Sequence, residues 1–317
     1  MDHSLPVICL MGPTASGKTG VAVELAQRFP LDIVSVDSAM VYRGMDIGTA
    51  KPEADMLARA PHRLIDICEP TETYSAARFR DDALREIRDI QEKGRVPLLV
   101  GGTMLYFRAL MQGLSVLPSA DPDLRERLLQ QALEHGWGAL HRRLQRVDSE
   151  AAARIHRNDT QRIQRALEVY ELTGRPMTSL MSSRETSAGS WHYVRWALMP
   201  PERTRLHARI EERFLAMLKS GFIDEVQRLR ARGDLDLNYS SMRAVGYRQI
   251  WQYLDGRLDH AEMVRAAVSA SRQFAKRQLT WLRSEPDLDW FDPESDDLLK
   301  DMSLRVRLMQ DGAEGGH

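Results

Sequence analysis

The feature that most constrains this chain is an eight-residue loop near its start, Gly12-Pro13-Thr14-Ala15-Ser16-Gly17-Lys18-Thr19. The loop has the form Gly-x4-Gly-Lys-Thr, follows the apolar residues 6–11 and precedes a stretch with helical periodicity, residues 18–29. Its glycines let backbone N–H groups turn towards an anion, and the N-terminus of the helix adds positive potential. Lys18 can neutralise phosphate charge, and the Thr19 hydroxyl can bind Mg²⁺. The loop therefore predicts that all eight residues bind a diphosphate or triphosphate.

The segments after this loop predict a P-loop NTPase-like α/β core, with a parallel sheet flanked by helices. Apolar runs that read as buried strands alternate with helical segments, and such alternation indicates a parallel sheet covered on both faces. The expected strands after the first are residues 31–36, 63–67, 96–100 and 192–199. Between the last two of these strands, residues 121–173 read only as Arg-rich helices, which predicts an all-helical insertion. The expected parts of the chain are residues 1–117 and 190–290 for the core, 118–189 for the insertion and 291–317 for an acidic, partly disordered tail.

Charge is distributed unevenly along the second half of the chain. Residues 201–284 contain 16 Lys and Arg against 10 Asp and Glu, whereas residues 285–317 contain 3 against 10. On a helix expected over residues 259–283, one stripe carries Arg265, Arg272, Lys276 and Arg283, and the opposite face carries Ala267, Ala270, Phe274 and Trp281. This pattern is compatible with a nucleic-acid partner, although charge alone favours two solvated helix surfaces of opposite sign.

Cysteine content and hydropathy exclude several classes of protein. The two cysteines, Cys9 and Cys68, are far apart, and no Cys/His cluster exists, so neither a disulfide framework nor a zinc finger is available. The apolar run at residues 7–11 is too short for a signal peptide or a membrane span. These observations predict a cytoplasmic protein that has no contact with a membrane.

The phosphate loop alone favours a kinase or NTPase, because most such loops hold ATP or GTP. The segment at residues 37–52, Asp-Ser-Ala-Met-Val-Tyr-Arg-Gly-Met-Asp-Ile-Gly-Thr-Ala-Lys-Pro, indicates another chemistry. It strongly resembles the tRNA dimethylallyltransferases, also called tRNA isopentenyltransferases. Similar motifs continue in the family's order over about residues 5–284, among them residues 101–103, 154–156, 158–159, 162–163, 165–170, 173–174, 207–210, 213, 221–222, 246–248 and 276–281.

The resemblance implies a reaction. The family transfers a dimethylallyl group from dimethylallyl diphosphate to N6 of the adenosine just 3′ of the tRNA anticodon, position 37, uses Mg²⁺ and releases diphosphate. Lys18, Thr19 with Mg²⁺, and a further cation would stabilise the departing anion. A carboxylate placed against the adenine amine can accept its proton as the new bond forms.

The catalytic candidates are Lys18, Asp37, Thr103 and Arg213. Asp37 follows a strand beside the phosphate loop, so we assign it as general base; a helix N-cap or a Mg²⁺ ligand is the alternative role. Thr103 ends another strand and, by resemblance, lies near the reacting centre, although it could be only a turn hydroxyl. Arg213 resembles a family arginine that faces the diphosphate, whereas its spacing alone is equally typical of a surface charge.

The resemblance also implies a set of tRNA contacts that would hold an extruded base of the anticodon stem-loop. The candidates are Asp37, Ser38, Ala39, Met40, Thr103, Arg125, Gln161, Arg162, Ile163, Gln164, Arg165, Met242, Arg243, Ala244, Val245, Gly246, Tyr247, Lys276 and Arg277. Each arginine, taken alone, is more often a solvated helix charge. Two positions depart from the family pattern: Met40 stands where many relatives have Gln, and Arg157 where many have Pro. Methionine offers no amide donor to a base.

Three other functions stay open at this point. An adenylate isopentenyltransferase would act on free AMP or ATP, a P-loop kinase or NTPase would transfer or release phosphate, and an RNA-binding module would have no activity. The absence of the Cys/His cluster of eukaryotic relatives favours a bacterial-type protein. No protein partner is implied, and a monomer is expected.

Overall fold

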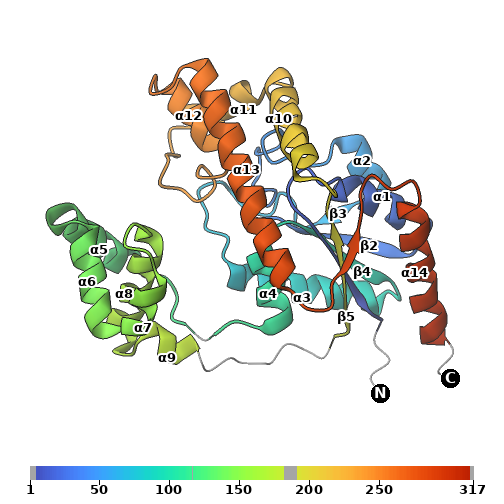
Figure 1. Ribbon diagram of the computed structural model, residues 1–317, viewed down its shortest axis with the longest axis horizontal. Helices are drawn as coiled ribbons and strands as arrows, with labels where there is room; N and C mark the ends of the chain where they lie inside the picture. The colour runs from blue at the N-terminus through green and yellow to red at the C-terminus, as the bar shows by residue number, and fades with distance from the viewer. Residues whose placement is uncertain (1–4, 116, 182–190, 315–317) are drawn as a thin grey trace. The chain divides into compact units, whose positions relative to one another are not determined.

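A computed structural model describes residues 5–115, 117–181 and 191–314, and the chain divides into two compact units. The first unit comprises residues 1–111 and 189–317, and the second comprises residues 112–188. The first unit contains a six-stranded, entirely parallel sheet in the order β3-β2-β4-β1-β5-β6 (Figure 1). The strands are β1 (Val7–Met11), β2 (Leu31–Val36), β3 (His62–Arg63), β4 (Val96–Gly101), β5 (Tyr193–Leu198) and β6 (Asp289–Phe291).

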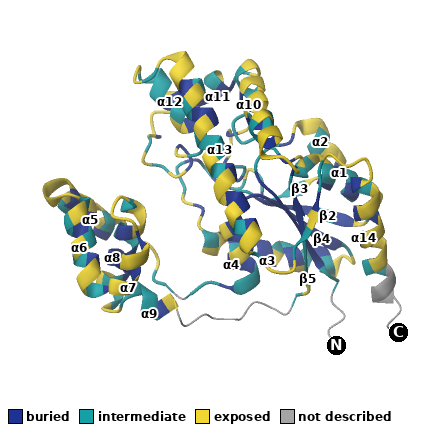
Figure 2. Ribbon diagram, viewed as in Figure 1, coloured by how far each residue is buried: buried dark blue, intermediate teal, exposed yellow. Residues whose placement is uncertain are grey.

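Both faces of the sheet are buried at its central strands β1, β2 and β4, which are largely dark blue in Figure 2. Successive residues of a strand point to opposite faces, so Ile8 and Leu10 pack with α1 (Lys18–Arg28) and α14 (Leu298–Glu314). Val7, Cys9 and Met11 belong instead to the core that includes α3 (Ala76–Glu92), α4 (Met104–Gln112) and α13 (His260–Ser284). Apolar strands without alternation are what a sheet covered on both faces requires.

Four helices follow β5 in the first unit: α10 (Arg203–Lys219), α11 (Phe222–Ala231), α12 (Tyr247–Leu254) and α13. Helix α13 begins at a capping box in which the Asp259 side chain accepts from the Glu262 N–H, and the Glu262 side chain accepts from the Asp259 N–H. The short helix α2 (Ala54–Arg59) lies between β2 and β3 in the chain. Together these helices carry residues to the carboxyl end of the sheet, where the loops after β1, β2 and β4 meet.

The named elements of the second unit, within its described residues, are all helices. The unit contains α5 (Pro122–His135), α6 (Trp137–Val147), α7 (Ser149–Arg154), α8 (Thr160–Thr173) and α9 (Met177–Met181), which share one apolar core. Asp121 caps α5, and Pro122 occupies the first helical position. The Ser- and Thr-rich loop expected at residues 178–190 falls largely outside the described residues, and its described start, up to Met181, is the end of α9.

Two expectations need correction. The strand expected at residues 63–67 ends at Arg63, because the backbone takes positive φ angles of 61° at Leu64 and 55° at Asp66. The acidic segment 291–317 contains α14, whose Met302 and Val306 are buried against the sheet, so most of it is a packed helix and not a tail. Its last residues, 315–317, lie outside the described part.

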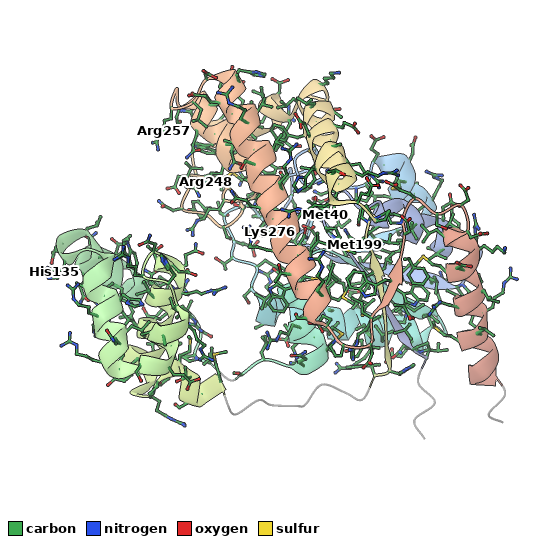
Figure 3. The ribbon with its side chains drawn as sticks, viewed as in Figure 1. Met40, His135, Met199, Arg248, Arg257 and Lys276 are labelled. Carbon is green, nitrogen blue, oxygen red and sulfur yellow. The ribbon has the colours of Figure 1, made fainter. Side chains whose placement is uncertain are left out.

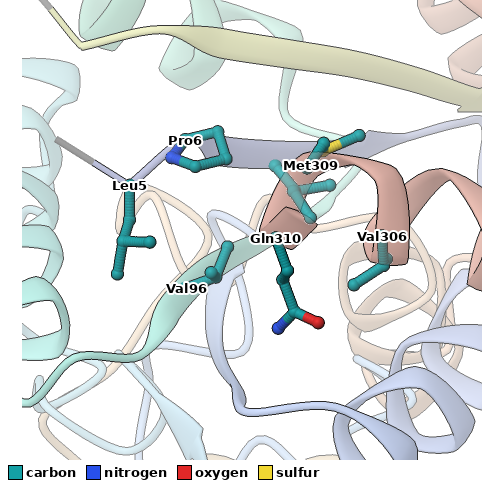
Figure 4. A pocket seen from close by; sticks show the side chains of 7 residues that line it. Leu5, Pro6, Val96, Val306, Met309 and Gln310 are labelled. Carbon is teal, nitrogen blue, oxygen red and sulfur yellow. The ribbon is translucent and has the colours of Figure 1, made fainter. Parts of the chain in front are cut away.

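Helix α14 also closes the edge of the core next to the start of β1. There, Leu5, Pro6, Val96, Val306 and Met309 line a small apolar cavity of about 10 Å³ (Figure 4). The apolar spacing of Leu298, Met302 and Val306 was the signal for this helix, and the run of acidic residues just before it, within residues 285–297, concealed it. Among the described helices, none combines the length and the low polarity needed to cross a membrane.

Candidate active site

The phosphate loop connects β1 to α1 and turns tightly around Lys18. Ala15 and Gly17 adopt positive φ angles of 63° and 87°, and the Lys18 ammonium donates to the Pro13 carbonyl at 2.7 Å and to Ser16 Oγ at 3.2 Å. Gly12 allows the loop to lie against β5, because a Cβ at this position would be 2.7 Å from the Leu198 carbonyl oxygen. The loop therefore forms a closed turn, and the Lys18 side chain folds back over the loop backbone.

Three charged groups share this part of the molecule. Burial and, to a smaller extent, the positive charge of Arg213 lower the pKa of Lys18 to about 7, and the negative charge of Asp37 opposes both effects. Arg213, which extends from α10, donates to the Thr14 hydroxyl at 2.7 Å. The structure thus brings the predicted base and the two predicted phosphate-binding cations to one site at the carboxyl end of the sheet.

Asp37 stands immediately after β2 and is held by its own turn. Its Oδ1 accepts hydrogen bonds from the backbone N–H of Ala39 at 2.8 Å and of Met40 at 3.2 Å. Within the described residues, its second oxygen has no hydrogen-bond partner. One carboxylate oxygen is therefore used for orientation, and the other makes no hydrogen bond to the described part of the chain.

Thr103 lies against the same turn from the end of β4. The Ser38 N–H donates to Thr103 Oγ1 at 3.1 Å, and the Thr103 N–H donates to the Val36 carbonyl at 3.3 Å. This hydroxyl therefore supports the residue next to Asp37. Met40 directs its sulfur inwards, where Ser35 Oγ donates to it at 3.9 Å, and Figure 3 labels its position.

Gln278, on α13, joins the two sides of the site, and sequence reasoning gave it no role. Its Oε1 accepts from the Thr14 N–H at 2.9 Å, and its Nε2 donates to the Gly102 carbonyl at 2.7 Å. The side chain is buried, and a Cβ at Gly102 would be only 2.3 Å from its Nε2. The only feature of the sequence that could have indicated this role is the position of the glutamine on the apolar face of a helix.

The chain is similar to known proteins of one family. A family model described as IPP transferase matches residues 40–285. The tRNA dimethylallyltransferase of Alkalilimnicola ehrlichii is 60% identical over 290 residues, which are 91% of this chain and 91% of that protein. The chain belongs to the IPP transferase family.

Solved structures of IPP transferases are also similar to this chain in fold. The tRNA isopentenylpyrophosphate transferase of Bacillus halodurans is 38% identical, with a TM-score of 0.71 over 98% of both chains. The tRNA delta(2)-isopentenylpyrophosphate transferase of Staphylococcus epidermidis is 33% identical, with a TM-score of 0.67 over 96% of this chain and 99% of that one. A eukaryotic dimethylallyltransferase acting on tRNA shares the fold at 23% identity, with a TM-score of 0.76 over 96% of this chain and 78% of that one.

The residues that the IPP transferase resemblance assigns to tRNA differ widely in exposure. Ser38, Gln161, Arg162, Arg243, Lys276 and Arg277 are exposed, and Figure 3 labels Lys276 on α13. Ala39, Gln164, Ala244 and Val245 are partly buried. Ile163, Met242 and Tyr247 are fully buried, so their side chains offer no surface to an RNA. These three residues and Gly246, which is also buried, could contact tRNA only through backbone atoms.

Two predicted tRNA contacts, Arg125 and Arg165, hold a buried carboxylate. Glu168 is fully buried. Its carboxylate accepts hydrogen bonds from Arg125 Nε at 2.8 Å and from an Arg165 NH group at 2.6 Å. Removing either arginine would leave a buried charge with fewer partners, which is strongly destabilising. Their position therefore has a structural explanation inside the second unit, and loss of tRNA binding in their variants would not by itself prove an RNA contact.

Tyr247 has a comparable structural role in the first unit. Its hydroxyl donates to buried Glu225, whose carboxylate also accepts from the backbone N–H groups of Asp46 at 3.1 Å, Ile47 at 2.7 Å and Gly48 at 3.1 Å. Burial and the charge of Glu225 both raise the pKa of Tyr247 above its ordinary value, so the phenol is a hydrogen-bond donor at neutral pH. This cluster fixes the end of the segment that begins at Asp37.

We expect Tyr247→Phe to lower the free energy of unfolding by about 2 kcal/mol, because a hydrogen bond to a buried charged group is lost. Turnover and the KM for RNA should stay within about twofold of wild type, since the side chain reaches no substrate. Denaturant unfolding and steady-state assays measure the two quantities. Unchanged stability combined with a large rise in the KM for RNA would show that the phenol contacts RNA.

Proposed function

We propose that this IPP transferase moves a dimethylallyl group from dimethylallyl diphosphate to N6 of the adenosine at the 3′ side of the tRNA anticodon. The observation that supports this most directly is the placement of Lys18, Arg213 and Asp37 at one site, with Asp37 held through a single oxygen. Cations that bind a leaving diphosphate and a base for the attacking amine are the two functions that this reaction needs.

The phosphate loop acts on the leaving group. As the allylic C–O bond breaks, negative charge builds on the diphosphate, and Lys18 and Arg213 lie where they can stabilise it. The N-terminus of α1 adds positive potential. Mg²⁺, when bound, supplies further charge neutralisation; Thr19 follows Lys18 and can donate one oxygen ligand to it. The described residues contain no group of three His, Cys, Asp or Glu side chains that could hold a metal.

Asp37 acts on the nucleophile. The adenine amine forms the new N–C bond and loses one proton, which the second oxygen of Asp37 accepts. Thr103 keeps the Asp37 turn in place through the Ser38 N–H, and Gln278 ties the turn that contains Thr103 to the phosphate loop. Donor and acceptor sides are thereby fixed relative to each other before substrates bind, which favours reaction by orientation. Met40 would pack beside the base and give it no hydrogen bond.

Mass spectrometry of tRNA nucleosides after incubation with dimethylallyl diphosphate and Mg²⁺ tests the proposal. We expect one modified adenosine per tRNA at the position 3′ of the anticodon, with release of one diphosphate. Radiolabelled prenyl transfer to AMP and ATP, measured in parallel, should be much slower than transfer to an unmodified anticodon stem-loop.

Two other outcomes would replace this proposal. Faster transfer to AMP or ATP than to the stem-loop would identify an adenylate isopentenyltransferase. Phosphate release from ATP that RNA stimulates, with no prenyl transfer, would identify a P-loop NTPase. The proposal also includes a monomeric, cytoplasmic enzyme whose macromolecular partner is tRNA, and sedimentation analysis of the free enzyme tests its oligomeric state.

A further inference from the structure

An open groove of about 510 Å³ runs between α10 and α13 on the first unit. Four cationic side chains line it, Arg203 from α10 and Arg265, Arg272 and Lys276 from α13, and Glu211 is its only carboxylate. The three cations on α13 lie within the twelve residues from Arg265 to Lys276, which is roughly 16 Å of helix. The other sides of the same two helices hold the phosphate loop through Arg213 and Gln278.

Most of the positive charge in this groove is uncompensated. Glu211 pairs with Arg272 at 2.6 Å, and Arg203 Nε donates only to the imidazole of His207 at 3.3 Å. Among the described residues, Arg265 and Lys276 have no ion-pair partner. Within the described part of the chain, Arg203, Arg265 and Lys276 therefore have no ion pair and can bind an anion.

The shape and lining of the groove favour a polyanion. A single phosphate would engage one or two of the cations, whereas charges spread along a helix match successive phosphates of a nucleic-acid strand. A prenyl chain needs an apolar surface, and Val264 and Val268 are the only apolar residues of the lining. Lys276, which the family resemblance assigns to tRNA, forms one end of the groove.

We propose that this groove binds the phosphodiester backbone of tRNA away from the reacting adenosine, with Arg203 and Arg265 as contacts beyond Lys276. The inference rests on the proposed function, because it takes tRNA as the substrate. Backbone contacts of this kind add affinity without reading sequence, and they position the duplex for the base contacts made elsewhere.

The test compares the full-length double variant Arg203→Gln/Arg265→Gln with a control of equal charge change, Lys219→Gln/Arg228→Gln. Lys219 and Arg228 are exposed, lie outside the groove and have no ion-pair partner among the described residues. Binding of unmodified tRNA is measured by fluorescence anisotropy at several salt concentrations. Binding of a short RNA of the anticodon loop alone, and the KM for dimethylallyl diphosphate, are measured beside it.

We expect the groove variant to bind tRNA about tenfold more weakly, with the slope of log affinity against log salt reduced by roughly one to two units. The control should bind as wild type, and neither variant should change binding of the loop RNA or the KM for the donor. Unchanged tRNA binding, equal loss in the control, or a raised donor KM would each overturn the inference. If wild type binds tRNA with the expected groove dependence but transfers no prenyl group, the proposed function fails while the groove assignment stands.

Discussion

Asp37→Asn should lower the turnover number about 100- to 10,000-fold, the range expected when a positioned general base is lost. The substitution is nearly isosteric. Its amide oxygen can still accept from the Ala39 and Met40 N–H groups, so the turn after β2 is retained. An NH₂ group then replaces the oxygen that would take the proton from adenine. Single-turnover prenyl transfer to tRNA, at saturating donor, measures the chemical step.

Asp37→Ala is the matched comparison, because it removes both the base and the acceptor for the two N–H groups. We expect the affinity for tRNA to stay within about threefold of wild type for Asp37→Asn and to fall further for Asp37→Ala. Equal loss of turnover and of tRNA affinity in Asp37→Asn would contradict the assignment and would make Asp37 a positioning residue for RNA.

Lys18→Met should raise the KM for dimethylallyl diphosphate by about 100-fold and lower turnover by a similar factor. Both effects follow from the loss of one charged donor at a departing anion, which is typically a 10²- to 10³-fold effect. Affinity for tRNA should change little, since Lys18 lies inside the phosphate loop and binds Pro13 and Ser16. Steady-state kinetics with each substrate varied in turn separate the two affinities.

The lowered pKa of Lys18 gives this variant two further readouts. Its pKa of about 7 lies below the ordinary 10.5, so the unfolded chain binds more protons between these values and stability rises with pH across that window. Lys18→Met should therefore be at least as stable as wild type at pH 7.5 without ligand, and thermal unfolding measures this.

Diphosphate binding favours the protonated amine, so wild type should take up nearly one proton on binding at pH 8 and far fewer at pH 6. Calorimetry in two buffers of different ionisation enthalpy counts these protons, and Lys18→Met should show no such uptake. Uptake that persists in the variant would assign the proton to another group and would contradict the role of Lys18.

The elements that were predicted correctly from the sequence are those that depend on a local pattern of residues. The Gly-x4-Gly-Lys-Thr loop, the apolar runs before and after it and the capped helices depend on residues close in the chain, and β1, β2, β4 and β5 were predicted within two residues of their ends. Strand β6 was missed because three residues are too few for a period, and helix α14 was missed because the acidic run before it, within residues 285–297, suggested a tail.

The sequence by itself determined a phosphate-binding loop, the segment after β2 that contains Asp37, and membership of a family whose motifs are spread over most of the chain. Tertiary structure alone decided which of these residues meet. Arg213 reaches Thr14 across 199 residues and Gln278 across 264, and Glu225 holds the loop at Ile47. The physical reason is that a parallel sheet gathers the ends of distant strands at one edge, while burial of a carboxylate or an amide requires partners that no local pattern specifies. Folding thus made Tyr247 a core donor and left Lys276 at the surface.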